Sequence, residues 1–83
     1  MSSVDYSRLR SLAARRLIRA LLDEGFLFVR QRGSHRRYAH PDGRRVTVPF
    51  TRSGETFAAG TLKSIIELQA KWSGEDLQRM GLL

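Results

Sequence analysis

One histidine stands among arginines and small turn residues, and this group is the part of the sequence best suited to chemistry. His35 directly follows Gly33 and Ser34 at a predicted junction of turn and strand. The arginines around it are Arg30, Arg32, Arg36 and Arg37. Imidazole both accepts and donates a proton near neutral pH, and guanidinium groups bind phosphate. The group fits two interpretations: acid–base chemistry on a phosphodiester, or an exposed histidine that only hydrogen-bonds RNA or a loop carbonyl.

The other chemical groups predict no further reaction centre. His40 lies five positions after His35, so the two side chains fall on opposite faces of one extended strand and are not expected to share a metal. We expect His40 to serve in a turn or in packing. The sequence contains no cysteine, and it shows no paired carboxylates, no glycine-rich phosphate loop and no Ser-His-Asp arrangement. We therefore expect no metal site and no cofactor.

Positive charge is concentrated in the same part of the chain. The 83 residues carry a formal net charge of +7, and residues 1–52 hold 12 of the 13 arginines but only four of the eight acidic residues. Such a field attracts RNA phosphates, an acidic protein, or both. Phosphate binding is the favoured interpretation for the arginines around His35. For Arg15, Arg16 and Arg19, a solvated helix face is as good an interpretation as phosphate binding.

The elements that must position these residues follow from hydrophobic spacing and turn residues. An amphipathic helix is predicted over residues 6–24, with Gly25 at its end. Strands are predicted over residues 26–31, 35–40 and 45–49, followed by a loop over 50–59. A second helix is expected after Thr61 as its N-cap, and a short last helix after Ser73. The order α-β-β-β-α predicts one α+β domain over residues 1–83: a three-stranded antiparallel sheet, two helices on one face and a short C-terminal helix.

The turn between the second and third strands decides which face His35 occupies. A turn of odd length places Tyr38 beside Val46 on the core face and leaves His35 and Arg37 facing outward, whereas a turn of even length reverses this. We expect core packing for Trp72, and prefer it over stacking on bases for Phe26, Phe28 and Tyr38.

Size and composition limit the function classes. A chain of 83 residues is too short for a dinucleotide-binding fold, a barrel or two catalytic lobes. The lack of cysteine fits a reducing compartment. No apolar run approaches the roughly 20 residues that span a bilayer, and the N-terminus lacks a signal-peptide pattern. We expect a soluble, cytoplasmic protein without a membrane partner.

Several motifs between about Leu17 and Ile66 carry a family resemblance. They are Gly25-Phe26, Val29–His35, Tyr38, His40-Pro41, Val46–Pro49 and Gly60–Ile65. Together they resemble the HicA toxins of bacterial and archaeal toxin–antitoxin modules, and Gly-Ser-His followed three residues later by Tyr is the most specific part. The resemblance implies a fold like that of double-stranded-RNA-binding domains (dsRBD-like), ribonuclease activity on messenger RNA, and a HicB-type antitoxin that covers the site. It maps the family's catalytic histidine onto His35.

We therefore predict a metal-independent endoribonuclease that cleaves mRNA and inhibits translation, with His35 as general acid or base. The predicted RNA-binding residues are Arg30, Arg32, Gly33, Ser34, Arg36, Arg37 and Lys63. Ser34, Tyr38 and Lys63 each fit the role of a second proton-transfer group. Phe50 departs from the family pattern, in which a histidine or another polar residue often follows Val-Pro.

Two interpretations from other classes stay open at this point. The first is a non-catalytic dsRBD-like RNA-binding module that grips the A-form backbone by shape and charge; it predicts steep salt dependence and no cleaved product. The second is a subunit whose basic face serves only an acidic protein partner, which predicts weak affinity for RNA at physiological salt.

Overall fold

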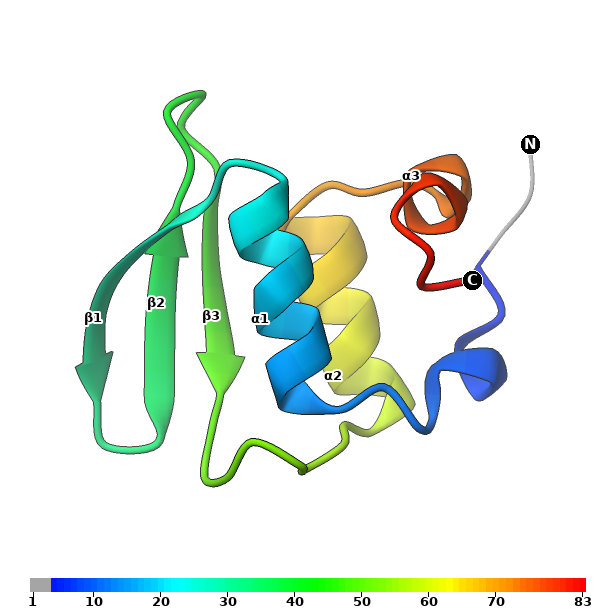
Figure 1. Cartoon of the computed structure of the whole chain (residues 1–83), viewed down its shortest axis with the longest axis horizontal. Coiled ribbons are helices and arrows are strands. Elements are labelled where there is room, and N and C mark those ends of the chain that lie inside the picture. The colour runs from blue at the N-terminus through cyan, green and yellow to red at the C-terminus, as the bar shows by residue number, and fades with distance from the viewer. Residues whose placement is uncertain (1–3) are drawn as a thin grey trace.

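Three strands form an antiparallel sheet whose spatial order follows the chain, in the computed structural model that describes residues 4–83 (Figure 1). β1 comprises Leu27–Arg32, β2 His35–Ala39 and β3 Arg45–Pro49. The structure confirms the three predicted strands, with boundaries that shift by at most one residue. Glycines with positive φ stand in the turns on both sides of β2, Gly33 at 57° and Gly43 at 100°, because L side chains are strained in this conformation.

Helices precede and follow the sheet in the predicted order. A 3-10 helix, η1, spans Tyr6–Leu9, and α1 spans Ala14–Asp23. α2, at Ala59–Lys63, continues directly as the π-helical segment η2 at Ser64–Gln69, and α3 spans Gly74–Arg79. Figure 1 shows α3 and the C-terminus at the end of the molecule away from the sheet. The fold is thus α+β with the α-β-β-β-α order and a short C-terminal helix.

The prediction of one continuous helix over residues 6–24 is wrong in its N-terminal half. Residues 10–13 interrupt the helix between η1 and α1. The amide of Ala14 donates to the carbonyl of Glu55 at 2.8 Å, and the amide of Arg15 donates to that of Ser53 at 2.9 Å. A continuous helix would direct these amides to the carbonyls of residues 10 and 11 instead. The loop before α2 therefore decides where α1 begins.

The start of α2 also differs from the prediction. Thr61 is not the N-cap, because the helix begins two residues earlier, at Ala59, and its cap residue Ala58 makes no side-chain hydrogen bond. The amide of Leu62 donates to the Ala58 carbonyl at 3.0 Å, which closes the first turn ahead of Thr61.

Two other predicted helix ends are confirmed. Gly25 follows α1 with a φ of 93°, and the amide of Phe26 donates to the Leu21 carbonyl at 2.9 Å, as in a Schellman motif. At α3, Ser73 Oγ accepts from the Asp76 amide at 3.1 Å, and Asp76 Oδ2 accepts from the Ser73 amide at 2.8 Å. This reciprocal pair is a capping box.

The core lies between the helices and one face of the sheet. Tyr38 pairs with Val46 in the β2–β3 register, and both are buried together with Val48. This confirms the outcome expected for an odd-length turn, because Tyr38 faces the core while His35 and Arg37 are exposed. The helices contribute fully buried side chains that include Leu17, Leu21, Leu62, Ile65 and Ile66.

β1 lies beyond the cover that the helices provide. All six of its residues are exposed, and Figure 1 shows it as the strand farthest from α1 and α2. Core packing is confirmed for Phe26, Tyr38 and Trp72 but is wrong for Phe28, which is 53% exposed. Phe28 makes an edge-on contact with Tyr38, with ring centroids 5.7 Å apart. No helix reaches far enough to cover its other side.

Candidate nucleic-acid interface

His35 begins β2 at the tip of a hairpin, directly after the turn formed by Gly33 and Ser34. It is exposed, and the register places it between Arg32 on β1 and Pro49 on β3. Among residues 4–83 its ring takes part in no hydrogen bond or ion pair. An imidazole in this position is open to a ligand that approaches the uncovered face of the sheet.

The face of the sheet that carries His35, called the open face below, is strongly cationic. Because side chains alternate along a strand, His35, Arg37 and Ala39 of β2 share this face. Directly paired residues of neighbouring strands share it too, and they are Leu27, Arg30 and Arg32 on β1 and Arg45, Thr47 and Pro49 on β3. The three strands contain five arginines and no acidic residue. Their charge is therefore not neutralised from within the sheet.

Three of the four arginines next to His35 in sequence share its face. Arg30, Arg32 and Arg37 are exposed there. Arg45 is not among the predicted RNA-binding residues, although its position next to the core residue Val46 already predicts an outward direction. The structure adds Arg45 to the candidate site.

Arg36 lies on the opposite, helix-covered face and is half-buried. Its guanidinium carbon stands 3.7 Å from the centre of the Phe50 ring, and its Nε donates to Gln31 Oε1 at 3.0 Å. The amide of Phe50 in turn donates to the Ser34 carbonyl. These contacts tie Arg36 to the base of the hairpin turn and do not place it beside the imidazole.

The remaining predicted residues occupy separate positions. Gly33 and Ser34 form the exposed turn before His35, while Lys63 is an exposed residue at the end of α2, away from the hairpin in the chain. Tyr38 is only 2% exposed and packs toward the core. Ser34 and Lys63 are the exposed residues of the three considered for a second proton transfer.

His40 has the packing role that its position predicted. Its Nδ1 accepts from the Asp42 amide at 3.0 Å, and its Nε2 lies 3.2 Å from the Glu24 carbonyl oxygen, to which it donates. Its ring meets Phe26 edge-on at 5.1 Å. A Cβ atom at Gly25 would come within 3.0 Å of Nε2, so a glycine leaves room for this contact. Within residues 4–83 no three His, Asp or Glu side chains gather as potential metal ligands.

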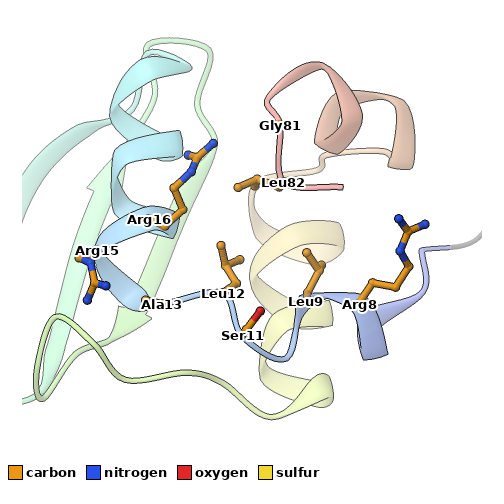
Figure 2. A pocket seen from close by; sticks show the side chains of 9 residues that line it. All are labelled: Arg8, Leu9, Ser11, Leu12, Ala13, Arg15, Arg16, Gly81 and Leu82. Atoms are coloured by element: carbon orange, nitrogen blue, oxygen red, sulfur yellow. The ribbon is translucent and has the colours of Figure 1, made fainter.

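An arginine-lined hollow of about 400 Å³ lies between η1, the start of α1 and the C-terminal residues. Figure 2 shows Arg8 and Arg15 pointing in different directions from its rim. Arg16 Nη2 already donates to the Met80 carbonyl at 2.8 Å. The first amides of α1 are occupied by loop carbonyls. This hollow therefore lacks the converging donors of an anion site, and the open face is the better candidate.

Fold and site together define a small cationic α+β domain with an exposed histidine on an uncovered sheet. The family model described as "HicA toxin of bacterial toxin-antitoxin" matches residues 14–72, and the chain belongs to this family. The protein is thus a toxin, and membership implies an antitoxin as its partner. The match spans α1, the sheet, α2 and η2 but leaves out η1 and α3. No curated protein matches the chain significantly, and no helix within residues 4–83 is long and apolar enough to cross a membrane.

Proposed function

We propose that this toxin is an endoribonuclease that cleaves messenger RNA without a metal ion and so inhibits translation. The observation that carries the proposal is the exposed imidazole of His35 on a sheet face that holds four arginines and no carboxylate. The guanidinium groups bind the phosphates on either side of the scissile bond, and His35 moves the proton.

The reaction uses a nucleophile that RNA itself supplies. His35 accepts the proton of a ribose 2′-hydroxyl, and the oxygen attacks the neighbouring phosphorus. The bond from phosphorus to the 5′-oxygen then breaks, and that oxygen takes up a proton from the imidazolium or from water. Arginines of the open face stabilise the charge that develops on the phosphoryl oxygens. The products are a 2′,3′-cyclic phosphate and a free 5′-hydroxyl, and DNA is not a substrate because it lacks the 2′-hydroxyl.

His35→Ala tests this assignment. General acid–base catalysis by one side chain contributes about 10² to 10⁴-fold, so we expect the variant to lose cleavage by that factor while it still binds RNA. Cleavage of a labelled transcript with excess chelator, and analysis of the ends for cyclic phosphate, measure the effect. Arg10→Ala, at an exposed position directly after η1 and outside the sheet, is the control and should cleave normally.

Three outcomes contradict the proposal in different ways. Unchanged cleavage by His35→Ala removes this residue from the site. A strict requirement for magnesium contradicts the metal-independent reaction. RNA binding by the parent chain without any cleaved product identifies a non-catalytic RNA-binding module instead.

We further propose that a HicB-type antitoxin covers the site by docking along β1. β1 is an edge strand with exposed Leu27, Phe28 and Val29, at 63%, 53% and 57%, and such an edge offers unpaired backbone groups to an added strand. A second copy of this chain, also at +7, would bring like charges together. An acidic strand of the antitoxin complements the arginines that flank this edge.

Two exposed leucines provide a matched test of the docking edge. Leu27→Ser lies on β1, and Leu68→Ser lies on η2, where Leu68 is 69% exposed. We expect Leu27→Ser to weaken the complex with the co-expressed antitoxin by roughly tenfold or more, and Leu68→Ser to leave it unchanged. Titration of the purified partners measures both. The reverse pattern would place the antitoxin on the helices and overturn the β1 assignment.

A further inference from the structure

The open face is hollowed beyond the position of His35. A depression of about 270 Å³ is lined by Val29, Arg30, Arg37, Tyr38, Ala39, Arg45, Val46 and Thr47. Tyr38 and Val46 face the core, so they contribute backbone to the lining. Val29 and Ala39 therefore supply the apolar side chains of the hollow, and the arginines and Thr47 supply its polar rim.

A β-bulge creates this arrangement. The β1–β2 register passes from Phe28 opposite Tyr38 to Arg30 opposite Arg37, so Val29 is the extra residue. In a bulge two residues oppose one on the partner strand. Val29 and Arg30 therefore lie on the same side of the sheet, whereas adjacent residues of a regular strand point to opposite faces. An apolar surface thereby joins a cationic rim.

The three rim arginines are free to bind a ligand. Arg30, Arg37 and Arg45 form no ion pair with any acidic residue among residues 4–83, and all three are exposed. A small apolar surface accepts the face of an unstacked base, and guanidinium groups bind the flanking phosphates or stack on the base. A base inside a duplex cannot enter, because it is stacked on both sides.

We infer that this hollow, lined by Val29 and Ala39 and rimmed by Arg30, Arg37 and Arg45, binds one nucleotide of single-stranded RNA next to the cleavage position. The inference rests on the proposed RNA substrate and extends it by selecting unpaired RNA. Ala39 lies about 13 Å along β2 from His35, so the bound nucleotide is a neighbour of the reacting one. RNA is favoured over an acidic peptide because the hollow continues the row of side chains that begins with His35.

The test compares single-stranded and duplex RNA in a chain that binds but does not cleave. His35→Ala serves as the parent, and labelled 12-nucleotide oligouridylate and a 12-base-pair RNA duplex are the probes. Ala39→Ile fills the hollow without a change of charge, and isoleucine is a residue that strands favour. Arg45→Gln removes one rim charge, and Arg10→Gln is its control, with the same loss of charge at an exposed position directly after η1 and outside the sheet.

We expect Ala39→Ile to weaken binding of the single strand about tenfold or more, the range of one lost base stack, and to leave the weaker binding of the duplex unchanged. Arg45→Gln should reduce the slope of log affinity against log salt by about 0.7, the value for one phosphate of a single strand, whereas Arg10→Gln should not. Circular dichroism of each variant establishes that it is folded.

Unchanged affinity in both Ala39→Ile and Arg45→Gln would overturn the inference while leaving His35 as the proposed catalytic residue. Equal losses for duplex and single strand would also overturn it. If Ala39→Ile affects only the antitoxin complex, the hollow is a protein-binding site and the inference is wrong. Cleavage that persists in His35→Ala contradicts the proposed function alone; the affinities are then measured with 2′-O-methyl oligouridylate, which lacks the attacking 2′-hydroxyl and so still tests the hollow.

Discussion

Arg36 and Arg37 are neighbours in sequence but serve different faces of the sheet. Arg37 is exposed beside His35 on the open face, while Arg36 stacks on Phe50 at 3.7 Å under the hairpin. Phe50 occupies the position at which the sequence departs from the family pattern. In this chain the residue therefore supports the base of the turn through an aromatic contact and contributes no polar group there.

The contact between Arg36 and Phe50 should appear as a coupling free energy. Cation–π contacts at partly exposed sites contribute about 0.5 to 1 kcal/mol. We expect urea unfolding of Arg36→Gln, Phe50→Leu and the double variant to show this coupling. The cycle of Arg37→Gln with Phe50→Leu is the control and should be additive, because Arg37 lies on the other face. Additivity in both cycles would refute the contact.

Among the elements, α3 is stabilised by its own first residues. Ser73 and Asp76 cap it reciprocally, and Leu77 is fully buried beneath them. The family model ends before this helix. Its position nevertheless follows from the local sequence, since a serine followed three residues later by an acidic residue forms the cap without help from distant parts of the chain.

Removal of this cap should lower stability in a pH-dependent way. Ser73→Ala should cost about 1 kcal/mol of unfolding free energy, and Ser11→Ala, at an exposed position between helices, should cost far less. The hydrogen bond from the Ser73 amide holds the pKa of Asp76 below its ordinary value of 3.8. A carboxyl with a lowered folded-state pKa stabilises the fold above its unfolded pKa, and loses this contribution as pH falls through the folded value.

Asp76→Asn isolates that contribution. We expect the loss of stability below about pH 4 to be shallower in this variant than in the parent, as measured by urea unfolding across the acid range. Asp42, Glu24 and Glu55 also have lowered pKa values, so the variant keeps part of the acid sensitivity. An identical pH profile for variant and parent would show that the cap is not formed in solution.

At the scale of the whole molecule, the two ends of the chain complete the core. Leu9 lies in η1 and Leu77 in α3, and both are buried although both fall outside the family match. Tyr6 donates a hydrogen bond to Glu67, and Arg16 reaches the carbonyl of Met80. These contacts join both terminal segments to α1 and η2.

Leu77→Ala should therefore destabilise the entire domain. Replacement of a fully buried leucine by alanine costs about 2 to 5 kcal/mol, a large part of the roughly 5 to 15 kcal/mol available to a small domain. We expect the melting temperature to fall by roughly 10 °C or more. Gln78→Ala, at the exposed neighbouring position, should change it by far less. A small shift for Leu77→Ala would mean that α3 is dispensable.

Local signals determined much of this protein from the sequence alone. Gly25, Gly33 and Ser73 predicted a helix end, a hairpin turn and a helix cap, because each effect depends on a few adjacent residues. The alternation of side chains along the second and third strands predicted that Tyr38 and Val46 face the core, provided that the turn between the strands has an odd length. The roles of His35 and of the arginines beside it stay predictions, which the proposed experiments address.

Tertiary structure decided the features that depend on residues far apart in the chain. The carbonyls of Ser53 and Glu55 set the start of α1, which hydrophobic periodicity could not foresee. The reach of the helices leaves Phe28 exposed at the sheet edge, and the bulge at Val29 forms the hollow on the open face. Hydrophobic spacing reports which residues favour burial, whereas three-dimensional packing decides which of them find a surface to cover them.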